Sequence, residues 1–234
     1  MKNFGFKVVS KNGEIGLIFN KKPVLWRRFL SELVKQRVIL RVKDAKKLLE
    51  KGDVEIYQVF NLWKFSKKAK EILKKYKLYV DLTLLFAGRF SRDGELFCTF
   101  GHLHEKERGE LYFCLKNSCY LLLSDFKNKL TRVVRLREGY GYLIHPRFAH
   151  RLVSFKKDAL VLTVSPIDAG HNYEIIKGKG FPYHLFEKKG KLKIIWNKKF
   201  PKHKLEMKRA KRIKFNWKKL KSILFEPENF PRFY

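Results

Sequence analysis

Three histidines and one glutamate near the middle of the chain have the residue types and spacing of metal ligands. His102 and His104 are two residues apart, and Glu110 and His150 follow later in the sequence. Residues two apart on a β-strand point to the same face, so both imidazoles can reach one point. Imidazole nitrogens with one carboxylate suit divalent Fe, Mn, Ni or Zn. A His-x-His pair alone is more often two partly buried polar residues, and it is the other two ligands that favour a metal site.

The sequence around these ligands predicts many short β-strands. From residue 78 onward, apolar runs alternate with turn residues at the spacing of a sandwich or barrel. Pro146 belongs at a strand end, and His150 opens the next strand, far enough along to return across a barrel. A final hairpin is expected over residues 184–197, with its turn at Lys189-Gly190.

The first third of the chain mixes strands with short helices. Asn12-Gly13 predicts a hairpin turn within residues 4–20. Apolar residues at helical spacing predict a helix over 43–51, and residues 54–63 have the pattern of a strand. Ser66 is expected to cap a second, basic helix.

The C-terminal part, residues 201–234, differs from the rest. It is rich in Lys and Arg, and its apolar residues recur every three or four positions, which predicts a basic amphipathic helix. An apolar stripe of this kind needs to be covered, so we expect it to pack on the barrel or on a partner subunit. The stripe consists of Met207, Ala210, Ile213, Trp217, Leu220 and Leu224.

Composition limits the class of protein. The chain has 234 residues, of which 45% are hydrophobic and 15% aromatic, so it can bury a core as one medium domain with appendages. No apolar run is long enough for a signal peptide or a membrane span. Three cysteines without zinc-ribbon spacing argue against a disulfide framework and favour the reducing cytoplasm.

The charge is strongly basic, with 54 Lys and Arg against 22 Asp and Glu and a net charge of +32. Such a field attracts nucleic acids and small phosphorylated molecules alike. The other interpretation is a chain-wide preference for lysine with no specific partner. Charge alone does not decide between them.

Two motifs together resemble a known family. Gly101-His102-Leu103-His104 with Glu110, followed by Gly139, Pro146 and His150, resembles the two cupin motifs. The run Ser165–Tyr173, which contains Asp168-Ala169-Gly170-His171, and the later Lys177–Phe181 resemble the signature of archaeal cupin-type glucose-6-phosphate isomerases. The similarity extends over about residues 3–200.

The resemblance implies a mainly β protein, a cupin double-stranded β-helix (jelly-roll barrel) with short N-terminal helices, to which the pattern of the tail adds a basic C-terminal helix. It implies an isomerase domain over 1–200, with N-terminal elements to about 77 and a barrel core over about 78–197. The basic extension over 201–234 lies beyond the resemblance. The implied activity is metal-dependent interconversion of glucose 6-phosphate and fructose 6-phosphate in glycolysis and gluconeogenesis, by a cytoplasmic homodimer. The partners are therefore a sugar-phosphate substrate and a second copy of the chain, with no membrane.

The family's functional residues map onto positions of this sequence. One divalent ion per chain would be held by His102, His104, Glu110 and His150. The residues implied in catalysis are Glu110, His171 and Tyr112. Those implied in binding the sugar and its phosphate are Tyr57, Thr83, Thr99, Gly101 and Tyr173.

The sequence also departs from the family pattern. Glu110 follows His104 by six residues, one fewer than the family has, so Glu105 or Glu107 could compete as ligand. Ser165 stands where the family has a tyrosine at the pocket. These departures leave a changed substrate or weak activity open, and the charge of +32 favours a rival function, a non-catalytic or differently specialised cupin with a basic nucleic-acid-binding surface.

The remaining histidines and the cysteines suggest no chemistry of their own. We expect His145 at the surface or the pocket edge, and His184 and His203 in solvent. The cysteines are expected to be small apolar strand residues.

Overall fold

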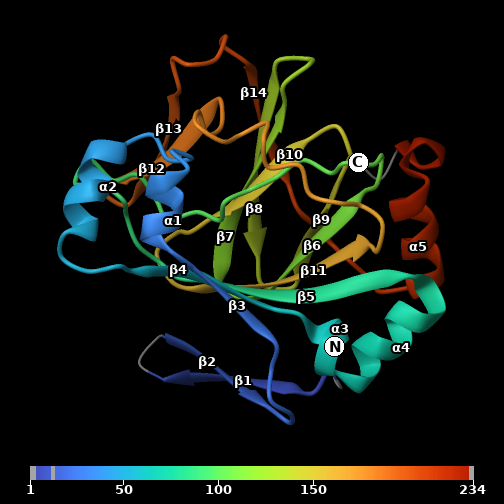
Figure 1. The fold of residues 1–234 in the computed structure, drawn as a ribbon. Coiled ribbons are helices and arrows are strands. Elements are labelled where there is room, and N and C mark those ends of the chain that lie inside the picture. The colour runs from blue at the N-terminus through green and yellow to red at the C-terminus, as the bar shows by residue number, and fades with distance from the viewer. Residues whose placement is uncertain (1–3, 12–13, 232–234) are drawn as a thin grey trace.

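Two β-sheets that face each other form the centre of the computed structural model, which describes residues 4–11 and 14–231 (Figure 1). The larger sheet has seven strands, in the order β15 (Lys211–Arg212), β9 (Tyr140–Ile144), β6 (Glu110–Lys116), β11 (Ala159–Pro166), β5 (Leu78–Leu85), β4 (Glu55–Phe60) and β3 (Leu25–Phe29). The smaller sheet has four, in the order β10 (Ala149–Val153), β7 (Ser118–Asp125), β8 (Leu130–Arg137) and β14 (Lys204–Arg209).

Nearly all neighbouring strands are antiparallel; the exception among the described pairs is β14, which runs parallel to β8. Single bridges join Cys98 to Val153 and His102 to His150, so residues 98–102 continue the smaller sheet beyond β10. The sequence prediction of a mainly β, cupin-type jelly roll is confirmed.

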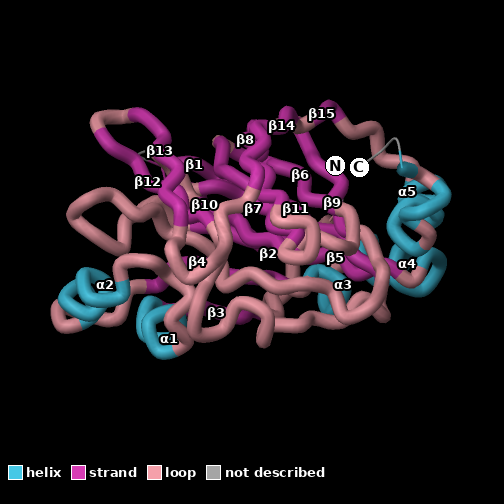
Figure 2. The backbone as a smooth tube through the Cα atoms, turned by 90° about the horizontal axis from the view of Figure 1, so that it is seen from above, coloured by secondary structure: helices cyan, strands magenta, loops and turns pink. Residues whose placement is uncertain are grey.

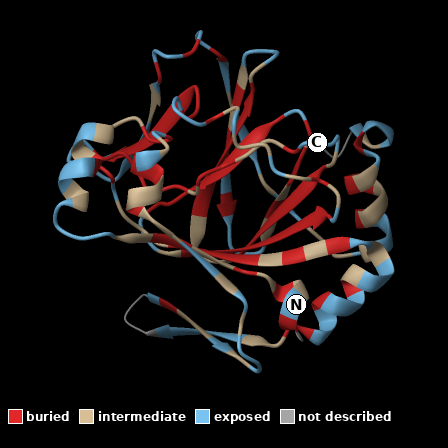
Figure 3. Ribbon diagram, in the orientation of Figure 1, coloured by how far each residue is buried: buried red, intermediate tan, exposed pale blue. Residues whose placement is uncertain are grey.

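The alternation of side chains along the strands separates two hydrophobic cores. One fills the space between the sheets and contains, for example, Leu85, Leu121 and Val161. The other lies on the outer face of the larger sheet, where Leu84 and Leu162 belong to the same cluster as residues of the nearby helices. Figure 3 shows buried residues concentrated in the strands of both sheets.

The predicted N-terminal elements are largely present. β1 (Phe6–Lys11) and β2 (Glu14–Phe19) form the expected hairpin, although its turn residues, Asn12 and Gly13, lie outside the described residues. The helices are α1 (Leu30–Lys35), α2 (Val42–Leu49), α3 (Leu62–Phe65) and α4 (Lys67–Tyr76). Ser66 caps α4 as predicted, because its side-chain oxygen accepts from the backbone N–H of Ala69. The strand predicted over 54–63 ends at Phe60, where α3 takes over after Asn61.

The C-terminal extension corrects one prediction. The basic helix exists as α5 (Trp217–Phe225), which buries Leu220 and Leu224, but it does not reach back to Met207. Met207 lies in β14 and is 59% exposed. The open edge of β8 offers unpaired backbone groups to residues 204–209, and this pairing outweighs the helical spacing of the apolar residues.

The hairpin predicted over residues 184–197 is present. It consists of β12 (Tyr183–Lys188) and β13 (Lys191–Trp196), and a 3-10 turn, η1 (Pro227–Asn229), follows α5 further along the chain. Seen from above, α1 and α2 lie at one end of the sheets and α4 and α5 at the other (Figure 2). None of the helices in the described part is long and apolar enough to cross a membrane. All three cysteines are buried and free, as predicted.

Candidate metal centre and substrate cavity

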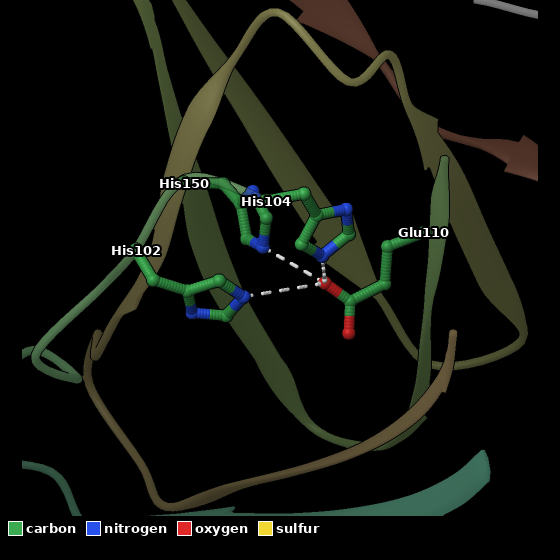
Figure 4. A group of neighbouring side chains, drawn as sticks. All are labelled: His102, His104, Glu110 and His150. Carbon is green, nitrogen blue, oxygen red and sulfur yellow. Dashed lines mark ion pairs between the residues drawn. The ribbon is translucent and has the colours of Figure 1, made fainter. Parts of the chain in front are cut away.

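The four predicted metal ligands converge inside the barrel (Figure 4). One ligand atom from each of His102, His104, Glu110 and His150 lies within 4.8 Å of the others. Glu110 Oε2 is 2.8 Å from His150 Nε2, 3.3 Å from His104 Nε2 and 3.9 Å from His102 Nε2. Four such donors around one point match the coordination of a divalent transition ion.

Different elements bring these ligands together. His102 and His150 face each other across a β-bridge, in which each backbone N–H donates to the other's carbonyl at 3.1 and 2.8 Å. Glu110 is the first residue of β6. Gly101 precedes His102 with a φ of +86°, and a Cβ there would come within 2.9 Å of the His150 carbonyl oxygen. A glycine at this position is therefore needed for the two histidines to meet.

The hydrogen bonds of the imidazoles leave the right nitrogens for a metal. His104 Nδ1 lies 2.6 Å from the carbonyl oxygen of Arg108, and His150 Nδ1 lies 3.0 Å from that of Phe148. Donation from Nδ1 fixes the tautomer with a lone pair on Nε2, which is the usual arrangement of metal-binding histidines. The Nε2 atoms of all three histidines and Glu110 Oε2 are buried without a hydrogen-bond partner. Because unsatisfied buried polar atoms are costly, the set fits a bound cation.

The pKa values of His102 and Glu110 agree with this arrangement, whereas the pKa of His104 is raised, because the effect of burial is outweighed by its contact with the Glu110 carboxylate. Burial, assisted by the nearby His150 and His171, holds the pKa of His102 well below its usual value. Burial would raise the pKa of Glu110, but the close ring nitrogens of His104 and His150 outweigh it and hold that pKa well below its usual range. A neutral imidazole and an ionised carboxylate are the forms that bind metal.

A cavity of about 450 Å³ opens from the ligand cluster. His102, Glu110 and His150 line its inner end, while His104 lies behind them. Every residue that the resemblance implies in catalysis or sugar-phosphate binding also lines this one cavity: Tyr57, Thr83, Thr99, Gly101, Tyr112, His171 and Tyr173.

His171 and Tyr173 stand at the exposed side of the cavity. The His171 ring lies 4.1 Å from that of His102, and its Nδ1 is 3.4 Å from the Tyr173 hydroxyl. Gly170, with a φ of +66°, lets this loop approach Glu105, whose carboxylate a Cβ would meet at 2.4 Å. Glu105 therefore supports the loop, and Glu110 rather than Glu105 or Glu107 is the carboxylate of the cluster.

The strand register explains the floor of the cavity. Thr163 of β11 lies between Tyr112 of β6 and Asp81 of β5, and Ser165 lies opposite Tyr79. All five side chains line the cavity, because residues directly opposite on neighbouring strands share a face.

Asp81 is a cavity residue that the sequence did not single out. Its Oδ1 accepts from Asn61 Nδ2 at 2.9 Å, and burial raises its pKa to about 7. Arg28, Trp63 and Lys64 also line the cavity without having been predicted. The chemical type of Asp81, on a strand face shared with the predicted Thr83, is the signal that could have found it.

Two histidines expected in solvent are buried. His184 Nδ1 lies 2.8 Å from Glu95 Oε1, and both side chains are almost fully buried. His203 packs against Phe126, with its Nδ1 3.2 Å from the Thr131 hydroxyl. Each prediction was wrong because the partner lies far away in the sequence.

The sequence matches a known family. The sequence model of the family described as "Glucose-6-phosphate isomerase (GPI)" matches residues 34–201. This chain belongs to the glucose-6-phosphate isomerase family. The glucose-6-phosphate isomerase of Thermococcus litoralis is 31% identical over 193 residues, which cover 82% of this chain and 93% of that protein. That of Pyrococcus furiosus is 30% identical over 196 residues, covering 83% and 95%.

Among solved structures, oxalate decarboxylase from Bacillus subtilis matches 49% of this chain and 25% of its own length, with a TM-score of 0.36 and 14% identity. The family assignment rests on the sequence relatives and not on this likeness.

Proposed function

We propose that this family member is a metal-dependent isomerase that interconverts glucose 6-phosphate and fructose 6-phosphate. The observation that carries the proposal is the set of four buried, unsatisfied ligand atoms at the inner end of a cavity of about 450 Å³. That volume lies within the range of small-molecule sites, roughly 300–1,000 Å³. The named relatives supply the substrate pair.

The proposed metal is one divalent ion per chain, held by His102, His104, Glu110 and His150. Three nitrogens and one carboxylate oxygen suit Fe, Mn, Ni or Zn. When bound, such an ion polarises a carbonyl and orients two sugar oxygens.

The chain's own residues would do the remaining work. Aldose–ketose exchange moves hydrogen between C1 and C2 of the sugar. Glu110 either takes the carbon-bound proton or serves only as a ligand while hydride shifts directly. Both other catalytic candidates lie beside the ligand cluster: the Tyr112 ring is 5.6 Å from that of His150, and the His171 ring is 4.1 Å from that of His102. Burial lowers the pKa of His171, which favours a neutral imidazole that can accept or donate a proton at its ring nitrogens.

The phosphate and the rest of the sugar need hydrogen-bond donors. Thr99 Oγ1 already accepts from the Leu152 N–H at 3.0 Å, which leaves its hydroxyl hydrogen for a ligand. Thr83 and the Gly101 backbone line the same wall. We assign phosphate binding to these three, and sugar contacts to Tyr57 and Tyr173.

We also propose that the enzyme works as a homodimer in the cytoplasm, in glycolysis and gluconeogenesis. Ile18 and Trp26 are 55% and 56% exposed, and exposed apolar side chains of this size are common at subunit contacts. Three buried free cysteines suit a reducing compartment. We retain the division into an isomerase domain over 1–200 and an extension over 201–234; the family match ending at residue 201 supports it.

The test is turnover of purified full-length protein. Fructose 6-phosphate is the substrate, and glucose 6-phosphate is detected with an NADP-linked dehydrogenase. We expect steady turnover by the wild type, and a Thr83→Val/Thr99→Val double variant should mainly have a higher KM. If the protein shows no turnover after loading with each of the four candidate metals in turn, the proposed reaction is rejected.

A further inference from the structure

The C-terminal extension forms a second cavity, here called the C-terminal groove, with a volume of about 620 Å³. It lies where β9 and β6 meet the segment that runs from β14 to α5, at the end of the molecule where Figure 2 shows β15 and α5. Of β6, Leu111 lines the groove, whereas its neighbours Glu110 and Tyr112 line the first cavity. The two cavities share no lining residue.

The walls of the groove are strongly basic. Its lining among the described residues contains no Asp or Glu, yet it contains seven Lys and Arg side chains: Arg132, Lys208, Arg209, Lys211, Arg212, Lys214 and Lys219. Like charges gathered around one cavity repel each other and produce a strong positive potential.

One nearby acid balances only part of this charge. Glu206 lies 3.2 Å from both Arg132 and Lys208, and 3.0 Å from Lys204. The hydrogen bond from Lys204, with those from Lys208 and Arg132, lowers the pKa of Glu206 to about 2, so it is ionised and shared among three cations.

Three other cations of the groove form no ion pair within the described part of the chain. Among the ion pairs of residues 4–11 and 14–231, none involves Arg209, Lys211 or Lys214. Arg212 instead lies over the ring of Tyr140, 5.7 Å from its centroid. An anion with several negative charges is the ligand that would neutralise this set.

The rest of the lining has the composition of a small-molecule site. Leu111, Leu143, Ile213 and Phe215 give it an apolar floor, and Tyr142 adds a hydroxyl. An apolar floor with polar or charged groups that orient the ligand is typical of sites for small ligands, and about 620 Å³ is within their usual volume. A nucleic-acid strand would be expected to follow an extended basic track instead.

Most of the groove lies outside the part that matches the family. The family match ends at residue 201, and eleven of the sixteen lining residues, Lys208 to Ile223, come after it. The ligand of the groove is therefore separate from the sugar phosphate of the first cavity.

We propose that the C-terminal groove binds a small polyphosphorylated anion. Arg and Lys are the preferred partners of phosphate oxygens, and two or three linked phosphates would reach cations on both walls at once.

The test is calorimetric titration of inorganic tripolyphosphate into the full-length protein at about 0.15 M salt. We expect one binding site per chain. Its affinity should fall at least about tenfold in the double variant Lys211→Glu/Lys214→Glu, because each substitution replaces an attraction with a repulsion. The matched control is Lys188→Glu/Lys191→Glu on the β12–β13 hairpin, which changes the net charge equally and lies outside the groove; its affinity should stay near that of the wild type. Saturating fructose 6-phosphate should not displace the tripolyphosphate.

Three results would overturn the proposal. Equal weakening in both double variants would mean attraction to bulk charge only. Displacement by fructose 6-phosphate would place the anion in the first cavity. Tighter binding of single-stranded RNA at the same salt, lost in the groove variant but not in the control, would make the groove a nucleic-acid surface.

If the melting temperature of the groove variant falls, Arg209→Glu on β14 gives the same readout from another strand. Turnover is not part of this test, so its outcome is independent of the proposed isomerase reaction.

Discussion

Asp81 lies on the floor of the first cavity, and changing it to asparagine tests whether burial there raises the pKa of its carboxyl group. Burial, with a further contribution from the charge of Glu110, raises its pKa to about 7, while Asn61, Trp63 and Lys64 act in the opposite direction. Asparagine has the same shape and can still accept the hydrogen bond that Asn61 donates. The variant therefore removes the ionisation and little else.

The size of the effect on the free energy of unfolding follows from the coupling between proton binding and folding. In the unfolded chain the carboxyl loses its proton near pH 3.8, but in the folded protein it keeps it until about pH 7. The folded state then binds more protons than the unfolded state over this range, so Asp81 makes the free energy of unfolding fall as pH rises from about 4 to about 7. A difference of about three pKa units corresponds to about 4 kcal/mol, an upper value because water in the cavity screens the charge.

The assay is urea unfolding of wild type and Asp81→Asn across this pH range. We expect similar stability near pH 4 and a variant that is more stable than wild type, by up to about 4 kcal/mol, near pH 8. Glu50→Gln, at an exposed position at the end of α2, is the control and should show no such trend. A difference between Asp81→Asn and wild type that stays constant with pH would refute a raised pKa at Asp81.

Further predictions concern the metal, the pocket and the extension. His150→Ala should lose most bound metal in elemental analysis, since it removes one of four ligands; full occupancy would contradict the ligand assignment. Glu110→Gln with normal metal content but no turnover would identify Glu110 as the base, and normal turnover would exclude that role. Ser165→Tyr should narrow the cavity and lower KM for fructose 6-phosphate; an unchanged KM would mean that Ser165 does not border the substrate. Leu224→Ala should cost about 2–5 kcal/mol of stability without changing metal affinity, because Leu224 is fully buried on the outer face of the larger sheet.

Much of the candidate metal centre could be predicted because its determinants are local. The spacing of His102 and His104 matches the two-residue period of a strand, and Pro146 marks the turn that returns His150 to them. Gly101 was implied by the resemblance, and its structural reason is the close approach of the chain at His150.

Other features depend on contacts that no local pattern contains. Glu95 and His184 are distant in sequence, so the buried pair that they form could not be predicted from either position. The extension was misjudged for a similar reason, since the edge of β8 converts residues 204–209 to a strand despite their helical spacing. Asp81 shares one face of β5 with the predicted site residue Thr83, which was the available signal, and the register with Thr163 places it on the cavity floor.

The central claim is that His102, His104, Glu110 and His150 hold one ion on which the isomerase reaction depends. The most direct measurement removes metal with a chelator, then adds back one metal at a time while metal content and turnover are followed together. We predict that turnover disappears with the metal and returns in proportion to bound ion, with a plateau at one ion per chain, and that His102→Ala shows neither tight binding nor recovery. Full turnover of the metal-free protein would contradict the account.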